Sequence, residues 1–149
     1  MKKLIILFLL AFTGMQLSAQ KAERITGMWW NAKKTAKIEI KKEANGSFSG
    51  TIVYLVPEKY KSGVPPKDDK NPDPKLCERS VLGLTVLSEL RYDAGKKEWD
   101  NGRIYDPRSG KTYKCYVWME DRDDMLFIKG YAVGIRWMGK LTEWTRPLL

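Results

Sequence analysis

The sequence predicts an all-β protein, built as an antiparallel barrel or sandwich. Strand-like segments recur at a spacing of about ten residues, with turn-forming residues between most of them. No segment carries the sustained periodicity of a long amphipathic helix. Once a leader is set aside, about 130 residues remain, which is enough for one hydrophobic core. We therefore expect a single domain of eight antiparallel strands.

Residues 1–19 have the three parts of a secretory signal peptide. The chain begins with Met-Lys-Lys, continues with an unbroken apolar run over residues 4–12, and has Ala19 at a plausible cleavage position. As a helix that run would span about 14 Å, short of the roughly 30 Å of a bilayer core, so we expect no transmembrane segment. The mature domain is then residues 20–149, and we expect it to be periplasmic or secreted.

The N-terminal half predicts three strands. Residues 25–31 form the first, and residues 36–42 alternate between apolar and charged side chains, which is typical of a half-buried strand. Asn45 and Gly46 predict a hairpin turn in which both residues have positive φ, and residues 48–55 form the return strand. One face of that strand is expected to hold Phe48, Gly50, Ile52 and Tyr54.

Residues 57–80 interrupt this pattern with five prolines, which preclude a regular strand or a long helix. A connection this long inside a compact domain is uncommon and is usually functional. Pro74 can open a short helical turn through Glu78. We expect this segment to form a lid or rim of the barrel.

The rest of the chain predicts five further strands joined by tight turns. Residues 93–97 and 106–110 contain the Asp, Gly and Pro residues that such turns require. The five strands are residues 81–92, 98–105, 112–120, 125–131 and 139–146. In the first of them, one face is expected to hold Leu82, Leu84, Val86, Leu90 and Tyr92.

The composition excludes several kinds of catalysis and of binding partner. The chain has 27 Lys and Arg, 18 Asp and Glu and no His, which excludes Ser-His-Asp triads and His-ligated zinc. Its net charge of +9 becomes +7 without Lys2 and Lys3. The remaining basic residues are scattered, so we expect no nucleic-acid partner and only a weak attraction to an anionic envelope surface. The acidic run 68–73 lacks the spacing of a calcium loop, and we expect no metal and no cofactor.

Carboxylate catalysis is a hydrolytic chemistry that the absence of His leaves open. Two acids about 5 to 10 Å apart can hydrolyse glycosides, and the candidates are Asp69, Asp73, Asp100 and Asp106. Any chain with this many acids offers such pairs, and an Asp-Pro sequence more often forms a turn. We therefore expect no catalysis, and a hydrolase stands as the third hypothesis.

Two features leave alternatives open. Cys77 and Cys115 either form a disulfide, which would contribute roughly 4 kcal/mol by closing a loop of about 39 residues, or remain free and buried. The chain also has many tryptophans, which either fill the core or line a ligand cavity. An eight-stranded barrel has just enough interior for one small ligand. The tryptophans are Trp29, Trp30, Trp99, Trp118, Trp137 and Trp144.

Two resemblances make the fold more specific. Gly27-Met28-Trp29 resembles the Gly-x-Trp motif of the lipocalin and calycin group, in which this Trp packs against an Arg of the last strand, here Arg146. That resemblance implies a lipocalin/calycin-like barrel with a cation–π contact at one end.

The chain also resembles the bacterial exported family called domain of unknown function 2147, over about residues 25–146. The resemblance implies a lipocalin-like fold, an extracytoplasmic location and no established reaction. Asn101-Gly102 departs from it, because the family commonly has Gly-Gly there. The matching stretches are residues 69–74, Arg79 with Gly83-Leu84, 102–107, 110–113, Leu126-x-Ile128-x-Gly130 and 144–146.

The motif residues are candidates for a ligand site, or for holding a loop and a hairpin in place. Asp69 and Asn71 can pin the long loop through backbone hydrogen bonds, Arg79 can pair with Asp69 or Asp73, and the tyrosines can meet across a hairpin. The candidate ligand-binding residues are Trp29, Asp69, Asn71, Arg79, Arg103, Tyr105, Tyr113 and Trp144.

The leading hypothesis is an exported barrel that binds a small, largely apolar or amphipathic molecule without catalysis. The second is an envelope protein-interaction module or inhibitor. The sequence does not fix the oligomeric state.

Overall fold

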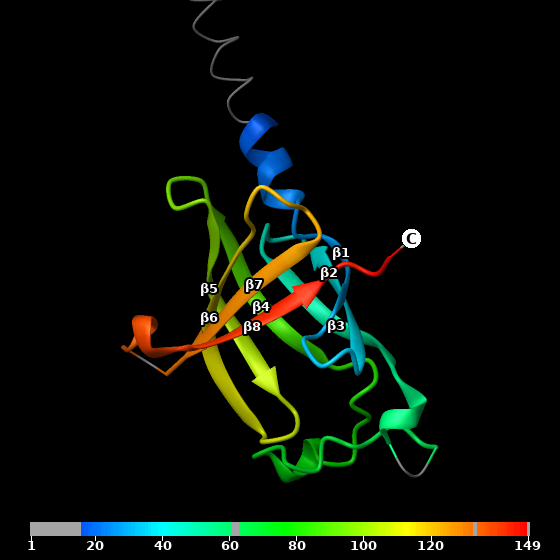
Figure 1. Cartoon of the computed structure of the whole chain (residues 1–149). Helices are drawn as coiled ribbons and strands as arrows, with labels where there is room; N and C mark the ends of the chain where they lie inside the picture. Colours follow the sequence, from blue (N-terminus) through cyan, green and yellow to red (C-terminus); the bar gives the residue numbers. More distant parts are fainter. Residues whose placement is uncertain (1–15, 61–62, 133, 149) are drawn as a thin grey trace, which may run out of the picture.

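The computed structural model describes residues 16–60, 63–132 and 134–148. In this part of the chain, eight strands follow one another in sequence order and close into an antiparallel barrel (Figure 1). Trp30 of the first strand pairs with Thr145 of the last to close the sheet. The expected eight-stranded antiparallel barrel is therefore confirmed. Its strands are β1 Gly27–Trp30, β2 Ala36–Lys42, β3 Phe48–Leu55, β4 Thr85–Asp93, β5 Glu98–Asp106, β6 Lys111–Trp118, β7 Met125–Tyr131 and β8 Lys140–Thr145.

The connections alternate between two ends of the barrel (Figure 1). What we call the closed end, uppermost in Figure 1, carries a helix over residues 16–23 and the turns 43–47, 93–97 and 119–124. What we call the open end carries the connections 31–35 and 106–110 and the described parts of the connections 56–84 and 132–139. Three short 3₁₀ helices belong to the open end: η1 Pro57–Lys59 and η2 Pro74–Leu76 between β3 and β4, and η3 Arg136–Met138 between β7 and β8. The helical turn expected after Pro74 is present as η2.

The helix over residues 16–23 was not expected. It begins before the predicted cleavage position at Ala19 and ends at residue 23, shortly before β1. Residues 1–15 of the predicted leader lie outside the described residues. Ala22 packs against the core, and its carbonyl accepts a 2.9 Å hydrogen bond from Trp99 Nε1. Cleavage after Ala19 would leave this contact in place.

The β2–β3 hairpin differs from the expected turn. Only Gly46 has positive φ, at 80°, and its amide donates to the carbonyl of Glu43. The Asn45 carboxamide instead accepts hydrogen bonds from the amide and hydroxyl of Ser47. This side-chain bonding replaces the two-residue turn with a longer loop over residues 43–47.

Two strands depart from the simple alternation that their sequences predict. In β3, an irregularity opposite Lys37 and Ile38 turns Tyr54 outward, where its ring meets Trp30 edge-on at 6.0 Å. Tyr54 is therefore exposed and does not share the buried face of Ile52. A bulge moves every following side chain to the other face, because strand side chains alternate.

The segment 81–92 is only partly a strand. β4 begins at Thr85, so Leu82 precedes it and is exposed. Glu89 has φ 61°, and this break in the strand places both Leu87 and Leu90 in the core, fully buried. Leu87 was missed by the sequence prediction because strict alternation would put it outside.

Candidate functional site

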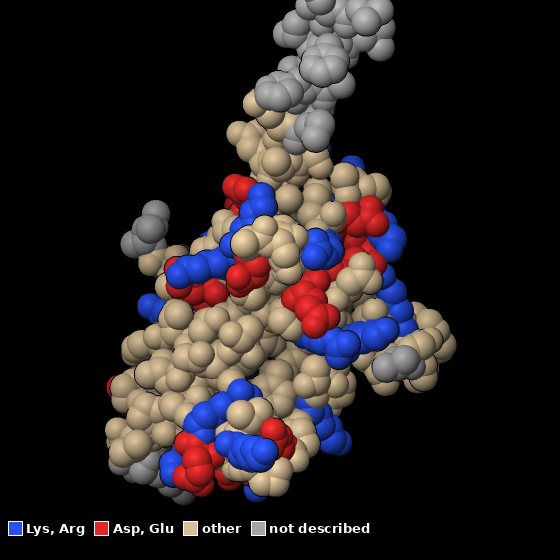
Figure 2. All heavy atoms as spheres, turned by 180° about the vertical axis from the view of Figure 1, so that it is seen from behind, with Lys and Arg blue, Asp and Glu red and all other residues tan. Residues whose placement is uncertain are grey.

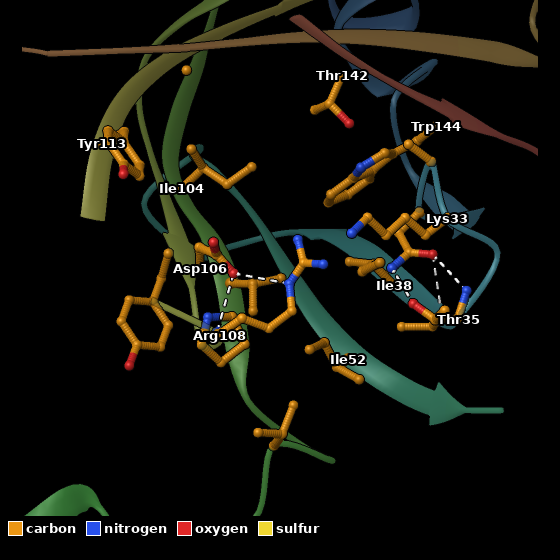
Figure 3. A pocket seen from close by; sticks show the side chains of 18 of the residues that line it. Lys33, Thr35, Ile38, Ile52, Ile104, Asp106, Arg108, Tyr113, Thr142 and Trp144 are labelled. Atoms are coloured by element: carbon orange, nitrogen blue, oxygen red, sulfur yellow. Dashed lines mark hydrogen bonds and ion pairs between the residues drawn. The ribbon is translucent and has the colours of Figure 1, made fainter. Parts of the chain in front are cut away.

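A cavity of about 1110 Å³ opens at the open end of the barrel (Figure 3). Its inner wall is apolar and is formed by strands that face one another across the barrel. The cavity therefore occupies the space between the two sides of the barrel. Thr142 and Tyr113 add hydroxyl groups to this wall. The apolar wall residues are Ala36, Ile38, Ile52, Val86, Ile104 and Trp144.

The mouth of the cavity is polar. Lys33 comes from the β1–β2 connection, Arg108 from the β5–β6 turn and Lys140 from the first residue of β8. Figure 3 shows the side chains of Lys33 and Arg108 reaching over the apolar wall. The Asp106 carboxylate lies beside Arg108, with 3.4 Å between Oδ1 and Nε. The cavity therefore combines an apolar interior with a charged entrance.

The β3–β4 segment is fixed to the barrel by a buried carboxylate. Asp68 is fully buried, and its Oδ1 accepts a 2.5 Å hydrogen bond from the hydroxyl of Tyr105. Its Oδ2 accepts from Asn71 Nδ2 at 2.8 Å and from Arg79 Nε at 2.9 Å. The segment is also tied to itself, because the amide of Asp68 donates to the carbonyl of Arg79. One carboxylate thus holds together the barrel wall and both arms of the segment.

Burial and hydrogen bonding act in opposite directions on this carboxylate. Burial alone would raise the pKa of Asp68, but hydrogen bonds from Tyr105, Asn71 and Arg79, together with the charge of Arg79, lower it below 3.8. Burial and the Asp68 charge both raise the pKa of Tyr105. At neutral pH the cluster therefore consists of a carboxylate and a protonated phenol, which is the state that the hydrogen bond requires.

The structure brings together only some of the expected ligand residues. Those that line the cavity are Asp69, Tyr105, Tyr113 and Trp144. Asn71 and Arg79 hold Asp68 instead. The expectation that Arg79 pairs with Asp69 or Asp73 is therefore wrong.

Two candidates lie elsewhere. Arg103 is exposed and pairs with Glu89 at 3.0 Å. Both residues lie outside the cavity lining. Trp29 is fully buried at the closed end. Its indole donates to the carbonyl of Ile25. Neither side chain can contact a molecule in the cavity.

Sequence reasoning missed Asp68, Lys33 and Arg108. Asp68 stands beside Asp69, and two adjacent acids give no signal as to which one is buried. Lys33 was counted among the scattered basic residues, and Arg108 was interpreted only as part of the turn 106–110. The turn signal at 106–110, read together with barrel topology, could have placed Arg108 at a barrel end.

Arg146 closes the barrel at the end opposite the cavity. Its Cζ lies 3.9 Å from the centroid of the Trp29 ring. Its NH1 donates to the carbonyl of Thr26 and its NH2 to that of Arg24, both at 2.8 Å. Gly27 suits this position, because its φ of 106° is one that other residues rarely adopt and a Cβ there would lie 2.7 Å from Arg146 NH1. The Gly-x-Trp and terminal Arg residues therefore meet in space.

The cysteines and the tryptophans lie in several different environments. Both cysteines are free: Cys115 is fully buried, and Cys77 lies in the β3–β4 segment with Sγ 3.4 Å from the carbonyl of Asn71. The six tryptophans also divide, because Trp144 lines the cavity while Trp29 and Trp99 are core. Trp137 is 77% exposed.

Two of the four candidate carboxylates, Asp69 and Asp106, line the cavity. Asp73 accepts from the amide of Lys75, and Asp106 accepts from the amide of Arg108. Asp100 lies outside the cavity lining. Burial would raise its pKa, but hydrogen bonds from Lys96 and the Asn101 amide and the charge of Arg136 lower it.

Asp69 is exposed at the mouth. Within residues 16–60, 63–132 and 134–148, no three metal-binding side chains gather. No helix in the described chain has the length and apolar character needed to cross a membrane.

An eight-stranded antiparallel barrel, with a cavity at one end and an Arg–Trp contact at the other, defines a lipocalin-like protein. Residues 27–146 match the model of the family DUF2147, described as uncharacterized protein conserved in bacteria, and the chain belongs to this family.

A solved structure gives the same fold. The chain is similar to protein HP1028 from the human pathogen Helicobacter pylori, described as belonging to the lipocalin family, with 28% identity and a TM-score of 0.70 over 83% of each chain. The comparison with curated proteins found no match. Fold and family together point to ligand binding in general terms.

Proposed function

We propose that this protein binds a small, largely apolar ligand inside the barrel and does not turn it over. The observation that carries the proposal is the cavity of about 1110 Å³ with an apolar inner wall. Cavities of this size, lined mainly by apolar side chains with a few polar groups, are typical of small-molecule sites. The β3–β4 segment covers part of the mouth and acts as its rim.

The test is to identify what the protein carries. Protein purified from its own host is examined by native mass spectrometry and by unbiased extraction of small molecules. We expect one class of apolar or amphipathic molecule at a constant ratio to the protein. An Ile104→Trp variant, which places a larger side chain in the cavity, should lose it. The matched control is Val53→Trp, because Val53 is exposed. Retention by Ile104→Trp would contradict binding in the cavity.

We propose that the mature chain acts in the periplasm or outside the cell. The support is the basic start, the apolar run over residues 4–12 and Ala19 in the leader. N-terminal sequencing of protein from the envelope fraction should begin at Gln20. Basic and acidic side chains are interspersed on the face displayed in Figure 2, which supports a solvated surface without a nucleic-acid partner.

A second function, binding another protein, is favoured by an exposed apolar group near η3. Ile135, Trp137, Met138 and Leu141 are all more than one third exposed. Apolar side chains gathered in this way often mark interaction surfaces. Crosslinking in the native host should recover one partner with the parent chain and lose it with Trp137→Ser/Met138→Ser. Recovery of small molecules alone would count against this function.

A further inference from the structure

The mouth of the cavity holds more positive charge than its own acids neutralise. Four basic side chains line it: Lys33, Lys67, Arg108 and Lys140. Lys67 is paired with Glu78, which leaves Lys33, Arg108 and Lys140, from three separate elements. Lys140 begins β8 two residues before Thr142, so the strand alternation places it on the same inner face. The charge therefore converges on one opening.

Three acids line the mouth: Asp69, Asp106 and Glu143. Asp69 is 69% exposed, and its Oδ2 lies 3.9 Å from the amine of Lys70. Asp106 accepts from the amide of Arg108 and from the hydroxyl of Ser109, both at 3.1 Å, which uses it to hold the turn. Its contact with Arg108 reaches only Nε, at 3.4 Å. Glu143 alternates with the inward-facing Thr142 and Trp144 of β8, and so faces outward.

Lys33 and Lys140 have no acidic partner in the described chain, and Arg108 has only the Nε contact with Asp106. Among the residues that the structure describes, no carboxylate lies within 4.0 Å of the amine of Lys33 or Lys140. Among the described residues, the Arg108 side chain donates only from Nε, to Asp106 at 3.4 Å, and Figure 3 shows its guanidinium above the apolar wall. These donors are thus available to a ligand.

We propose that the ligand is an amphiphile with one anionic head group, either a carboxylate or a phosphate. Lys33, Arg108 and Lys140 bind the head at the mouth, through charge-assisted hydrogen bonds. The apolar tail lies along Ile38, Ile52, Ile104 and Trp144. This inference rests on the proposed function, and it adds the chemical class of the ligand and the residues that recognise it.

The test compares ligands that share a tail and differ in the head. Dodecanoate, dodecyl phosphate, dodecanol and dodecyltrimethylammonium are each titrated into the purified protein at low salt, below their micelle-forming concentrations, with tryptophan fluorescence as the readout. At least one anionic ligand should bind about tenfold more tightly than dodecanol, equivalent to about 1.4 kcal/mol. The carboxylate and phosphate arms decide which head group is preferred. Added salt should weaken the preference.

Variants assign the preference to the mouth. Lys33→Gln/Arg108→Gln/Lys140→Gln should bind dodecanoate and dodecyl phosphate no better than dodecanol, with dodecanol affinity unchanged. A control with the same change of net charge alters three exposed cations toward the closed end: Lys41→Gln/Lys97→Gln/Arg122→Gln.

The outcomes separate the two proposals. Three outcomes would overturn the anionic head group while leaving the barrel as an apolar binder. The first is equal binding of charged and neutral ligands. The others are a preference for anionic ligands that survives the triple change at the mouth, or one that disappears equally in the control. Failure of all four ligands to bind would overturn the proposed function along with it.

Discussion

The hydroxyl of Tyr105 donates a 2.5 Å hydrogen bond to Oδ1 of the fully buried Asp68. Tyr105 belongs to β5 and lines the cavity, while Asp68 belongs to the long β3–β4 connection. The bond therefore joins the wall of the cavity to the segment at its mouth. Because the same carboxylate also holds Asn71 and Arg79, its loss would release both arms of that segment.

Tyr105→Phe should loosen the segment without unfolding the barrel. Removing one hydrogen bond to a buried carboxylate should lower the free energy of unfolding by about 1 to 3 kcal/mol. Amide hydrogen exchange should accelerate at Asp68 and Val81, whose amides bond within the segment, and not at Ile128 in the core. Tyr113→Phe is the control, since Tyr113 is partly exposed. Unchanged exchange at Asp68 would contradict this role.

Asp68→Asn should make stability less sensitive to acid. The folded pKa of Asp68 lies below 3.8, so its stabilisation is fully present above that value and is lost as the pH falls through the folded pKa. At pH 7 the substitution should lower the free energy of unfolding by about 1.5 to 3 kcal/mol. The gap between the two proteins should narrow on acidification. Denaturant melts at several pH values measure it, and a constant gap would refute the assignment.

The two cysteines should differ in reactivity. Burial, with a smaller contribution from the charge of Asp100, raises the pKa of Cys115 to about 12, so its thiol should not react in the folded protein. Cys77 is partly exposed. A thiol reagent such as DTNB should modify one cysteine per native chain and both after denaturation, and Cys77→Ser should abolish the fast reaction. If neither thiol reacts in denaturant until a reductant is added, the pair is a disulfide.

Much of the barrel follows from local sequence. The predicted bounds of β2 and β3 agree with the structure, because alternation marks β2 and the turn residues Asn45 and Gly46 separate it from β3. Bulges cannot be predicted in this way. The local sequence does not indicate that Tyr54 turns outward or that Leu87 turns inward, because both depend on pairing with a neighbouring strand.

The site was harder to predict than the fold. Tyr105, Tyr113 and Trp144 were found from motifs, and all three line the cavity. Asp68 was missed, because burial of one of two adjacent acids is decided by a tyrosine far away in sequence. Lys33 and Arg108 matter only once the barrel brings two of its connections to one end.

Arg146 and Trp29 should be energetically coupled. Arg146→Met removes the cation–π contact and the hydrogen bonds to three carbonyls, and should lower the free energy of unfolding by about 2 kcal/mol. A double-mutant cycle with Trp29→Phe should give a coupling of about 1 kcal/mol. Arg122→Met is the control at an exposed ion pair and should change stability by less than about 0.5 kcal/mol. Additive effects of Arg146→Met and Trp29→Phe would argue against coupling.

Asn101 has a backbone conformation that favours glycine, which is the residue that the family resemblance led us to expect there. Its φ is 59°, in an irregularity of β5 opposite β6, and its side chain is exposed. This left-handed conformation strains most side chains, Asn less than others. Asn101→Gly should therefore change the free energy of unfolding by less than about 0.5 kcal/mol, whereas Asn101→Val should lower it by about 1 to 2 kcal/mol.

The matched control is Lys114→Val, at an exposed position of β6 whose φ is not positive. Valine suits an ordinary exposed strand position, so this change should be close to neutral. The comparison isolates the backbone, because both substitutions place the same side chain in solvent on neighbouring strands. Equal losses of stability at Asn101 and Lys114 would show that valine is unfavourable on this surface for other reasons, and would remove the backbone as a reason to expect glycine in place of Asn101.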